Sequence, residues 1–134
     1  MNNNVQLLID ARALIAKESN WTKQSLAEKC INPDCEDEKL WDEVHVSSPY
    51  AVRFCALGAL ERAAHYRESN YNLPLRYLID AIPKDFPHNR DLGYVMETWT
   101  VTDYNDDHDR THEEVLSVYD RAIELAKERV HHEV

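Results

Sequence analysis

Four side chains of this chain have the chemistry of a covalent active site. Cys55 could act as a nucleophile, Asn105 and Asp106 could orient a base, and Gln24 could donate a hydrogen bond to an oxyanion. A catalytic thiol needs an electropositive, partly open site, whereas Cys55 lies in the most apolar run of the chain. A small buried core residue is therefore the favoured interpretation of Cys55. The four residues remain candidates for catalysis, and none is assigned.

The histidine that would complete such a site is difficult to supply. His65 lies ten residues after Cys55 on the same expected helix, nearly three turns away, so its ring cannot reach the thiol. Three further histidines lie in or beside expected loops and could fold over the thiol: His88, His108 and His112. Asn105 and Asp106 also have a structural interpretation, because such side chains often bind nearby backbone N–H groups and fix a turn.

Metal binding is a second possibility near residue 108. His108 and His112 are four residues apart, which on one helix would present both rings to a metal ion. Thr111 and Glu114 form a capping box, so the helix is expected to begin after His108 and the two rings need not share a face. Carboxylates in the preceding loop would in any case favour the positive end of the helix dipole. We predict no metal here and no cofactor.

The three cysteines give little further chemistry. Cys30, Cys35 and His45 have tolerable zinc spacing, but a second ligand pair is missing. The amino terminus lacks the basic start and long apolar core of a signal peptide, and no apolar run approaches the length that spans a bilayer. These observations predict a cytosolic protein with free thiols.

Composition favours a helical domain that binds proteins rather than nucleic acids. A chain of 134 residues predicts one domain over residues 1–134. Two glycines are too few for the many tight turns of a β-sandwich or barrel. The formal net charge of −10 repels phosphate and favours a protein partner with a basic surface. The sequence gives no reason to expect membrane binding.

The expected elements surround one apolar helix. Ser48 and Pro49 suit a helix start, and the helix would continue to Tyr66 with its most apolar part at residues 53–64. Gly58 is expected to permit the close approach of a neighbouring backbone. The other helices are expected at residues 3–19, 22–29, 73–82 and after 111, while residues 94–104 fit a strand or a helix. The fold class is therefore all-α, with about five helices around a buried central helix.

Residues 31–48 are the expected contact surface. This segment combines a turn at its start with a large aromatic ring beside acidic residues. The residues predicted to bind a partner are Trp41, Glu36, Asp37 and Glu38.

Three motifs in this order resemble an uncharacterised family of small bacterial and phage domains. They are Trp21-Thr22-Lys23-Gln24-Ser25-Leu26-Ala27, then Phe54-Cys55-Ala56-Leu57-Gly58-Ala59-Leu60, then Tyr104-Asn105-Asp106 before a capped helix with Arg110-Thr111 and Glu114-Val115. The family has Gly where this chain has Ser25, and Trp where it has Tyr104. The resemblance covers about residues 5–130, and it implies a fold and a phage or mobile-element context without an activity.

Three functional hypotheses follow from these observations. The first is a non-enzymatic, acidic, cytosolic interaction protein of phage or prophage origin that binds another protein. The alternative is a small enzyme or ligand-binding domain with a pocket formed by Cys55, Gln24, Asn105 and Asp106. The third is a metal-dependent domain that uses the loop at residues 103–112 or the cysteine pair.

Overall fold

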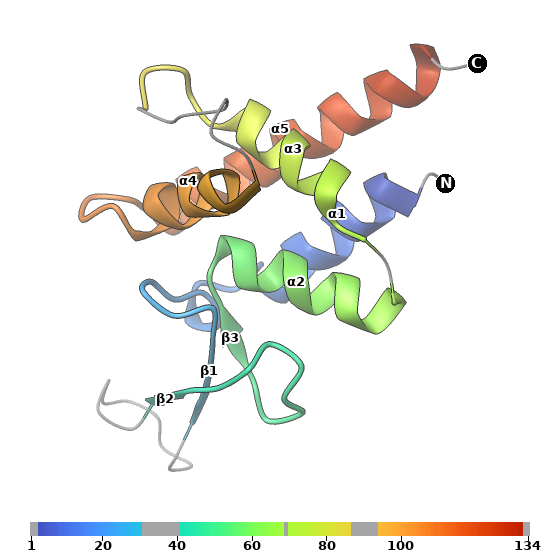
Figure 1. The fold of residues 1–134 in the computed structure, drawn as a ribbon. Helices are drawn as coiled ribbons and strands as arrows, with labels where there is room; N and C mark the ends of the chain where they lie inside the picture. The colour runs from blue at the N-terminus through green and yellow to red at the C-terminus, as the bar shows by residue number, and fades with distance from the viewer. Residues whose placement is uncertain (1–2, 31–40, 69, 87–93, 133–134) are drawn as a thin grey trace.

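The computed structural model describes residues 3–30, 41–68, 70–86 and 94–132 (Figure 1). Most of this part of the chain is helical, but three short strands form an antiparallel sheet. The elements in order are α1 (Asn3–Leu14), the 3-10 turn η1 (Glu18–Asn20), β1 (Ala27–Cys30), β2 (Trp41–Glu43), β3 (Arg53–Phe54), α2 (Ala56–Arg67), α3 (Asn72–Ala81), α4 (Tyr94–Asp106) and α5 (His112–His132). The all-α prediction is therefore wrong, because a sheet stands beside the helices.

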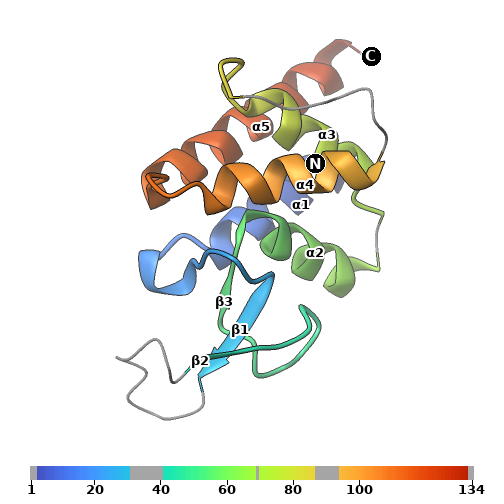
Figure 2. The same ribbon diagram turned by 60° about the vertical axis from the view of Figure 1, so that its left-hand side comes forward.

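The sheet has the strand order β2-β1-β3 and lies at one end of the molecule, below α2 (Figures 1 and 2). Its register pairs Glu28 with Glu43 on one side and with Arg53 on the other. β1 lies where a short helix at residues 22–29 was expected. Helical periodicity is weak evidence over so few residues, and the partner strands that fix β1 come from distant parts of the sequence.

The central helix begins later than Ser48 and Pro49 suggest. Cys55 is extended, with φ −81° and ψ 177°, and it is the residue that precedes α2. The preceding Arg53 and Phe54 form β3, and both are buried. A run that is apolar on all sides thus divides into a buried strand followed by a buried helix, which sequence periodicity cannot distinguish from one longer helix.

Gly58 permits the close approach that was predicted for it. A Cβ atom at this position would lie 1.8 Å from the carbonyl oxygen of Leu26, so no side chain fits there. The residue lies in the first turn of α2, where the chain that enters β1 passes directly against the helix. This prediction is confirmed.

The helices pack in layers around α2 and α5. α1 lies between these two helices, and α4 crosses beside α2 and α3 (Figure 2). The largest fully buried side chains in the core include Leu7, Leu8, Leu60, Leu75, Leu78 and Tyr119. Residues 94–104, which fitted either a strand or a helix, belong to α4, and Val101 and Tyr104 lie one turn apart on its buried side.

The predicted capping box at the start of α5 is confirmed. The backbone N–H of Thr111 donates to Glu114 Oε1 at 2.9 Å, and the N–H of Glu114 donates to Thr111 Oγ1 at 3.2 Å. This reciprocal pair fixes where the loop after α4 turns into α5, and it therefore also fixes the position of Arg110 immediately before the helix.

Candidate functional site

The side chain of Asn105 joins three separate parts of the chain. Its Oδ1 accepts from Trp21 Nε1 at 2.7 Å and from the backbone N–H of Ala56 at 3.0 Å. Its Nδ2 donates to the carbonyl oxygen of Thr22 at 3.0 Å and to Asp106 Oδ1 at 2.9 Å. All four hydrogen-bonding positions of the amide are used, and Asn105 has no exposed surface. We call these five residues the Asn105 junction.

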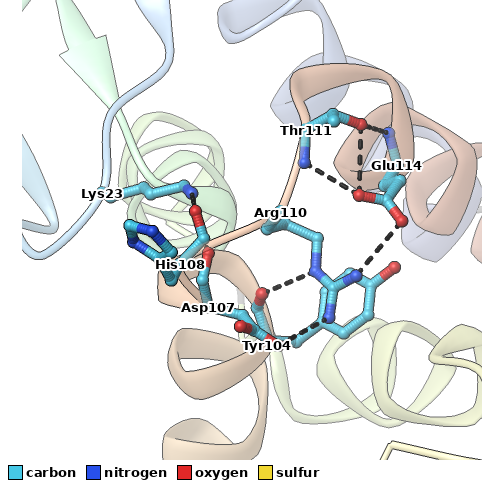
Figure 3. Close-up of polar contacts among 7 residues, drawn as sticks. All are labelled: Lys23, Tyr104, Asp107, His108, Arg110, Thr111 and Glu114. Atoms are coloured by element: carbon cyan, nitrogen blue, oxygen red, sulfur yellow. Dashed lines mark hydrogen bonds and ion pairs between the residues drawn. The ribbon is translucent and has the colours of Figure 1, made fainter.

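Asp106 and Lys23 extend the contact between α4 and the segment before β1. Asp106 Oδ1 accepts from the backbone N–H of Gln24 at 2.8 Å, and Gln24 has a left-handed φ of 70°. Lys23 Nζ donates to the carbonyl oxygens of Asp107 at 2.7 Å and His108 at 3.2 Å (Figure 3). These two carbonyls follow directly after the carboxyl end of α4, where a cation compensates the helix dipole.

Cys55 lies beside the junction but is sealed from solvent. It is 2% exposed, and its Sγ accepts the backbone N–H of Gly58 at 3.3 Å, which caps the start of α2. Burial raises the pKa of the thiol to about 12, and the hydrogen bond from Gly58 only partly opposes this rise. A thiol in this environment stays protonated at neutral pH, so the geometry does not favour a nucleophile.

The structure thus brings the catalytic candidates near one another without forming a reactive centre. The polar groups of Asn105 bind protein backbone and the Trp21 indole, and the exposed Gln24 contributes its backbone N–H to Asp106 rather than an oxyanion donor. The arrangement ties α4, the start of α2 and the segment at Trp21 together. It stabilises the fold because all four hydrogen-bonding positions of the buried Asn105 amide have partners.

The metal-ligand candidates are also placed by the structure. His112 Nε2 hydrogen-bonds the carbonyl oxygen of Ile15 at 2.6 Å, and its ring lies 5.7 Å from that of Trp21. Within the described residues, no group of three or more His, Cys, Asp or Glu side chains could hold a metal ion. Cys30 is disulfide-bonded and Cys55 is free. The expectation of free thiols is therefore wrong for Cys30, and Cys35 lies outside the described residues.

A different polar cluster surrounds Tyr104, the residue before Asn105. The guanidinium of Arg110 lies over the Tyr104 ring, with Cζ 3.5 Å from the ring centroid, and Nε donates to the Tyr104 carbonyl oxygen at 2.9 Å (Figure 3). Its other nitrogens lie 3.4 Å from Asp107 Oδ2 and 3.3 Å from Glu114 Oε2. Phe86 meets the same tyrosine ring edge to face. Arg110 is therefore held on four sides and is only 13% exposed.

Two adjoining hollows open beside this cluster, with volumes of about 400 and about 320 Å³. Both are lined by Pro83, Tyr104 and Glu114, and together we call them the Tyr104 cleft. Burial raises the pKa of the Tyr104 phenol, with Arg110 opposing the rise. The hydrogen bond from the Thr111 backbone lowers the pKa of Glu114. At neutral pH the cleft therefore presents a neutral phenol beside an ionised carboxylate.

Sequence reasoning missed this cleft. It named Tyr104 and Arg110 as parts of a motif and predicted no functional role for either side chain. The available signal was an arginine immediately before a capping box whose glutamate is one turn later, a spacing that brings both side chains together.

Of the four predicted partner-binding residues, Trp41 belongs to the described part of the chain. Glu36, Asp37 and Glu38 lie outside the described residues. Trp41 is half-buried in β2, and the Arg53 guanidinium stacks on its ring, with Cζ 3.8 Å from the centroid. Arg53 also pairs with Glu28 at 2.6 Å. Trp41 therefore packs against the sheet rather than projecting freely from the surface.

The fold and the junction define a small, mainly helical domain with a three-stranded sheet, organised around hydrogen bonds of one buried asparagine. The chain belongs to a family of unknown function, DUF6197, whose model matches residues 1–125. The resemblance to an uncharacterised family is thereby confirmed at that level. A search of curated proteins and a search of solved structures each found no match.

Within residues 3–30, 41–68, 70–86 and 94–132, no helix is both long enough and apolar enough to cross a membrane.

Proposed function

We propose that this protein is a non-enzymatic, acidic interaction protein that binds another protein. The observation that carries the proposal is a group of exposed apolar side chains around the loop between β2 and β3. Tyr50 is 72% exposed and Tyr66 is 67% exposed, and Val52 is also exposed. We call these three residues the Tyr50 surface. Tyrosine is enriched at protein interfaces because it offers a large apolar ring with a polar end.

The loop that carries this surface is held firmly against α2. Arg62, a buried residue of α2, donates from Nη1 to the carbonyl oxygens of Val46 at 2.7 Å and Ser48 at 2.5 Å. Its Nη2 donates to the hydroxyl of Tyr66. Tyr66 and the loop are thus held by one guanidinium group. A surface that is already ordered loses less conformational entropy when a partner binds.

Charge indicates the kind of partner. With a formal net charge of −10, the protein attracts a basic surface and speeds its association at low salt. Asp42 and Glu43 in β2 are exposed at the sheet end of the molecule. Trp41 stays part of the proposed contact region, as do Glu36, Asp37 and Glu38 from the sequence. A cytosolic location and a phage or prophage origin also belong to this proposal, and both rest on the sequence.

The alternative, an enzyme or ligand-binding domain centred on Cys55, receives less support. Its thiol is buried and protonated at neutral pH, and the amide of Asn105 has no free position for a ligand. We therefore do not propose this pocket as the functional site.

Paired substitutions test the proposed surface. Tyr50→Ser with Val52→Ser removes two of its exposed side chains, and Leu73→Ser with Trp99→Ser removes two exposed apolar side chains elsewhere. A partner is first identified by affinity capture from cells that carry the gene and is then purified. We expect the first variant to bind this partner at least about tenfold more weakly and the second to bind normally.

The purified partner also tests the finer assignment. Trp41→Ala should weaken the complex, and added salt should lower the association rate. Equal affinities for wild type, the Tyr50/Val52 variant and Trp41→Ala would contradict the proposed contact region.

A further inference from the structure

Tyr104 leaves an unused polar group in the cleft that it lines. The residue is 5% exposed, yet no hydrogen bond joins its hydroxyl to any described residue. Its backbone carbonyl, by contrast, accepts from Arg110. The ring is buried while the hydroxyl oxygen is open to the cleft, where it can accept a hydrogen bond from a bound group. This observation is independent of the Tyr50 surface.

The face of the Tyr104 ring is already occupied. Arg110 lies over it, and Phe86 packs against it with ring centroids 5.2 Å apart. A ligand therefore approaches at the hydroxyl edge of the ring, where Glu114 lines both hollows. Figure 3 shows the hydroxyl and the Glu114 carboxylate on the same side of Arg110.

The charges around the cleft select the sign of the ligand. Four carboxylates line it, Asp85, Asp107, Glu113 and Glu114, against the guanidinium groups of Arg110 and Arg121. Two of the carboxylates already pair with Arg110, which leaves that guanidinium unavailable to an anion. An excess of carboxylates beside a hydroxyl oxygen that can accept a hydrogen bond favours a cation that can donate hydrogen bonds.

We propose that the Tyr104 cleft binds an organic cation with N–H donors, either a protonated primary amine or a guanidinium group. One N–H donates to the Tyr104 hydroxyl, and the positive charge is balanced by Glu114 and the neighbouring carboxylates. The source of the cation is either a small free amine or a lysine or arginine side chain on a protein. This binding site goes beyond the proposed protein interaction, and each can fail without the other.

The test is a titration followed by backbone amide NMR at constant ionic strength. The probes are butylammonium and butylguanidinium, with butanol and butyrate as the neutral and anionic controls. We expect saturable shifts around Tyr104 and residues 110–114 with the two cations and none with the controls. No saturable shift with either cation, or equal binding of butanol, would overturn the proposal.

Two variants examine the role of the residues. Tyr104→Phe removes only the hydroxyl and should weaken both cations about tenfold, whereas Tyr50→Phe makes the same change on another surface and should have no effect. Glu113→Gln removes one carboxylate and should weaken binding about threefold. Unchanged affinity in Tyr104→Phe would show that the hydroxyl does not contact the cation and would overturn the site.

A lysine-containing peptide then distinguishes the two sources of the cation. Binding of the peptide at the cleft at least tenfold tighter than butylammonium would support a protein side chain as the ligand. Equal affinities would support a free amine. Both results require the same loss in Tyr104→Phe.

Discussion

Tyr104 and Asn105 are consecutive residues of α4 with opposite relations to the rest of the protein. The Asn105 side chain uses all its hydrogen-bonding positions inside the protein, and it joins α4 to the start of α2 and to Trp21. The Tyr104 hydroxyl uses none within the described residues and lines an acidic cleft. A polar residue type does not by itself indicate a functional site. Its hydrogen bonds decide whether the side chain serves the fold, as in Asn105, or is available to a ligand, as in Tyr104.

The largest effect is expected from removal of the Asn105 amide. Asn105→Ala leaves the Trp21 indole N–H, the Ala56 N–H and the Thr22 carbonyl without their partner in a buried place. Unsatisfied buried groups cost about 1–3 kcal/mol each, so we expect a loss of about 4 kcal/mol in the free energy of unfolding. Urea unfolding followed by circular dichroism measures it. A loss below about 1 kcal/mol would contradict the claim that the hydrogen bonds of the Asn105 junction stabilise the fold.

Gly58 gives the next largest effect. Gly58→Ala places a methyl group against the carbonyl oxygen of Leu26, and because this oxygen belongs to the backbone, the chain before β1 must move away from α2. We expect a loss of about 3 kcal/mol, although alanine has the higher helix propensity. Thermal and urea unfolding of the variant are the measurements. A gain in stability, as for an ordinary helical glycine, would show that the two backbones do not meet there.

Cys55, which lies beside the Asn105 junction, makes the stability of the protein sensitive to alkaline pH. Its pKa is about 12 in the folded protein, against 9.0 for an ordinary thiol. Between these values the unfolded chain loses the proton first, so stability falls as pH rises above about 9. At pH 10.5 this thiol alone should lower the free energy of unfolding by about 2 kcal/mol. Tyr119 acts in the same direction, because burial raises its pKa well above the usual value.

The variant Cys55→Ala isolates the contribution of the thiol. It should be less stable at neutral pH but should show a shallower decline between pH 8 and pH 10.5 than the wild type. Parallel declines in the two proteins, measured by urea unfolding at each pH, would contradict the raised pKa.

The smallest change in stability is expected for a substitution in the Tyr104 cleft. Tyr104→Phe keeps the ring under Arg110 and against Phe86, and it removes a hydroxyl that has no hydrogen bond to the described residues. Its stability should therefore stay within about 0.5 kcal/mol of the wild type. A larger loss, seen in the same urea experiment as Asn105→Ala, would mean that the hydroxyl serves the fold and not the cleft.

The sequence predicted local structure well where the determining residues are close together. The capping box at Thr111 and Glu114 and the close approach at Gly58 are both confirmed. The helix expected at residues 3–19 is present with Leu7, Leu8, Ala11 and Ile15 buried, although α1 ends at Leu14. The capping box and the α1 helix depend on residues within a few turns of one another. Gly58 was informative for another reason, because a glycine inside a helix costs stability and so indicates a close contact, but the sequence did not identify Leu26 as its partner.

The sheet and the junction could not be predicted in the same way. β1 pairs with strands that lie later in the sequence, and the Asn105 amide binds Trp21 at a separation of 84 residues. Sequence analysis grouped Gln24, Cys55, Asn105 and Asp106 as one candidate pocket, but it did not predict which way their polar groups point. Whether an amide faces a pocket or a backbone N–H depends on tertiary packing, which spacing does not contain.

Thiol labelling of Cys55 tests the central claim most directly, namely that Cys55 and the Asn105 junction beside it are a sealed structural part of the fold and not a reactive site. In a protein with Cys30→Ser and Cys35→Ser, Cys55 is the only thiol, and its reaction with a disulfide reagent can be followed against urea concentration. The account predicts slow labelling in native buffer, with a rate that rises with urea in parallel with global unfolding. Rapid labelling without urea would contradict it, because Cys55 would then be an accessible, ionised thiol.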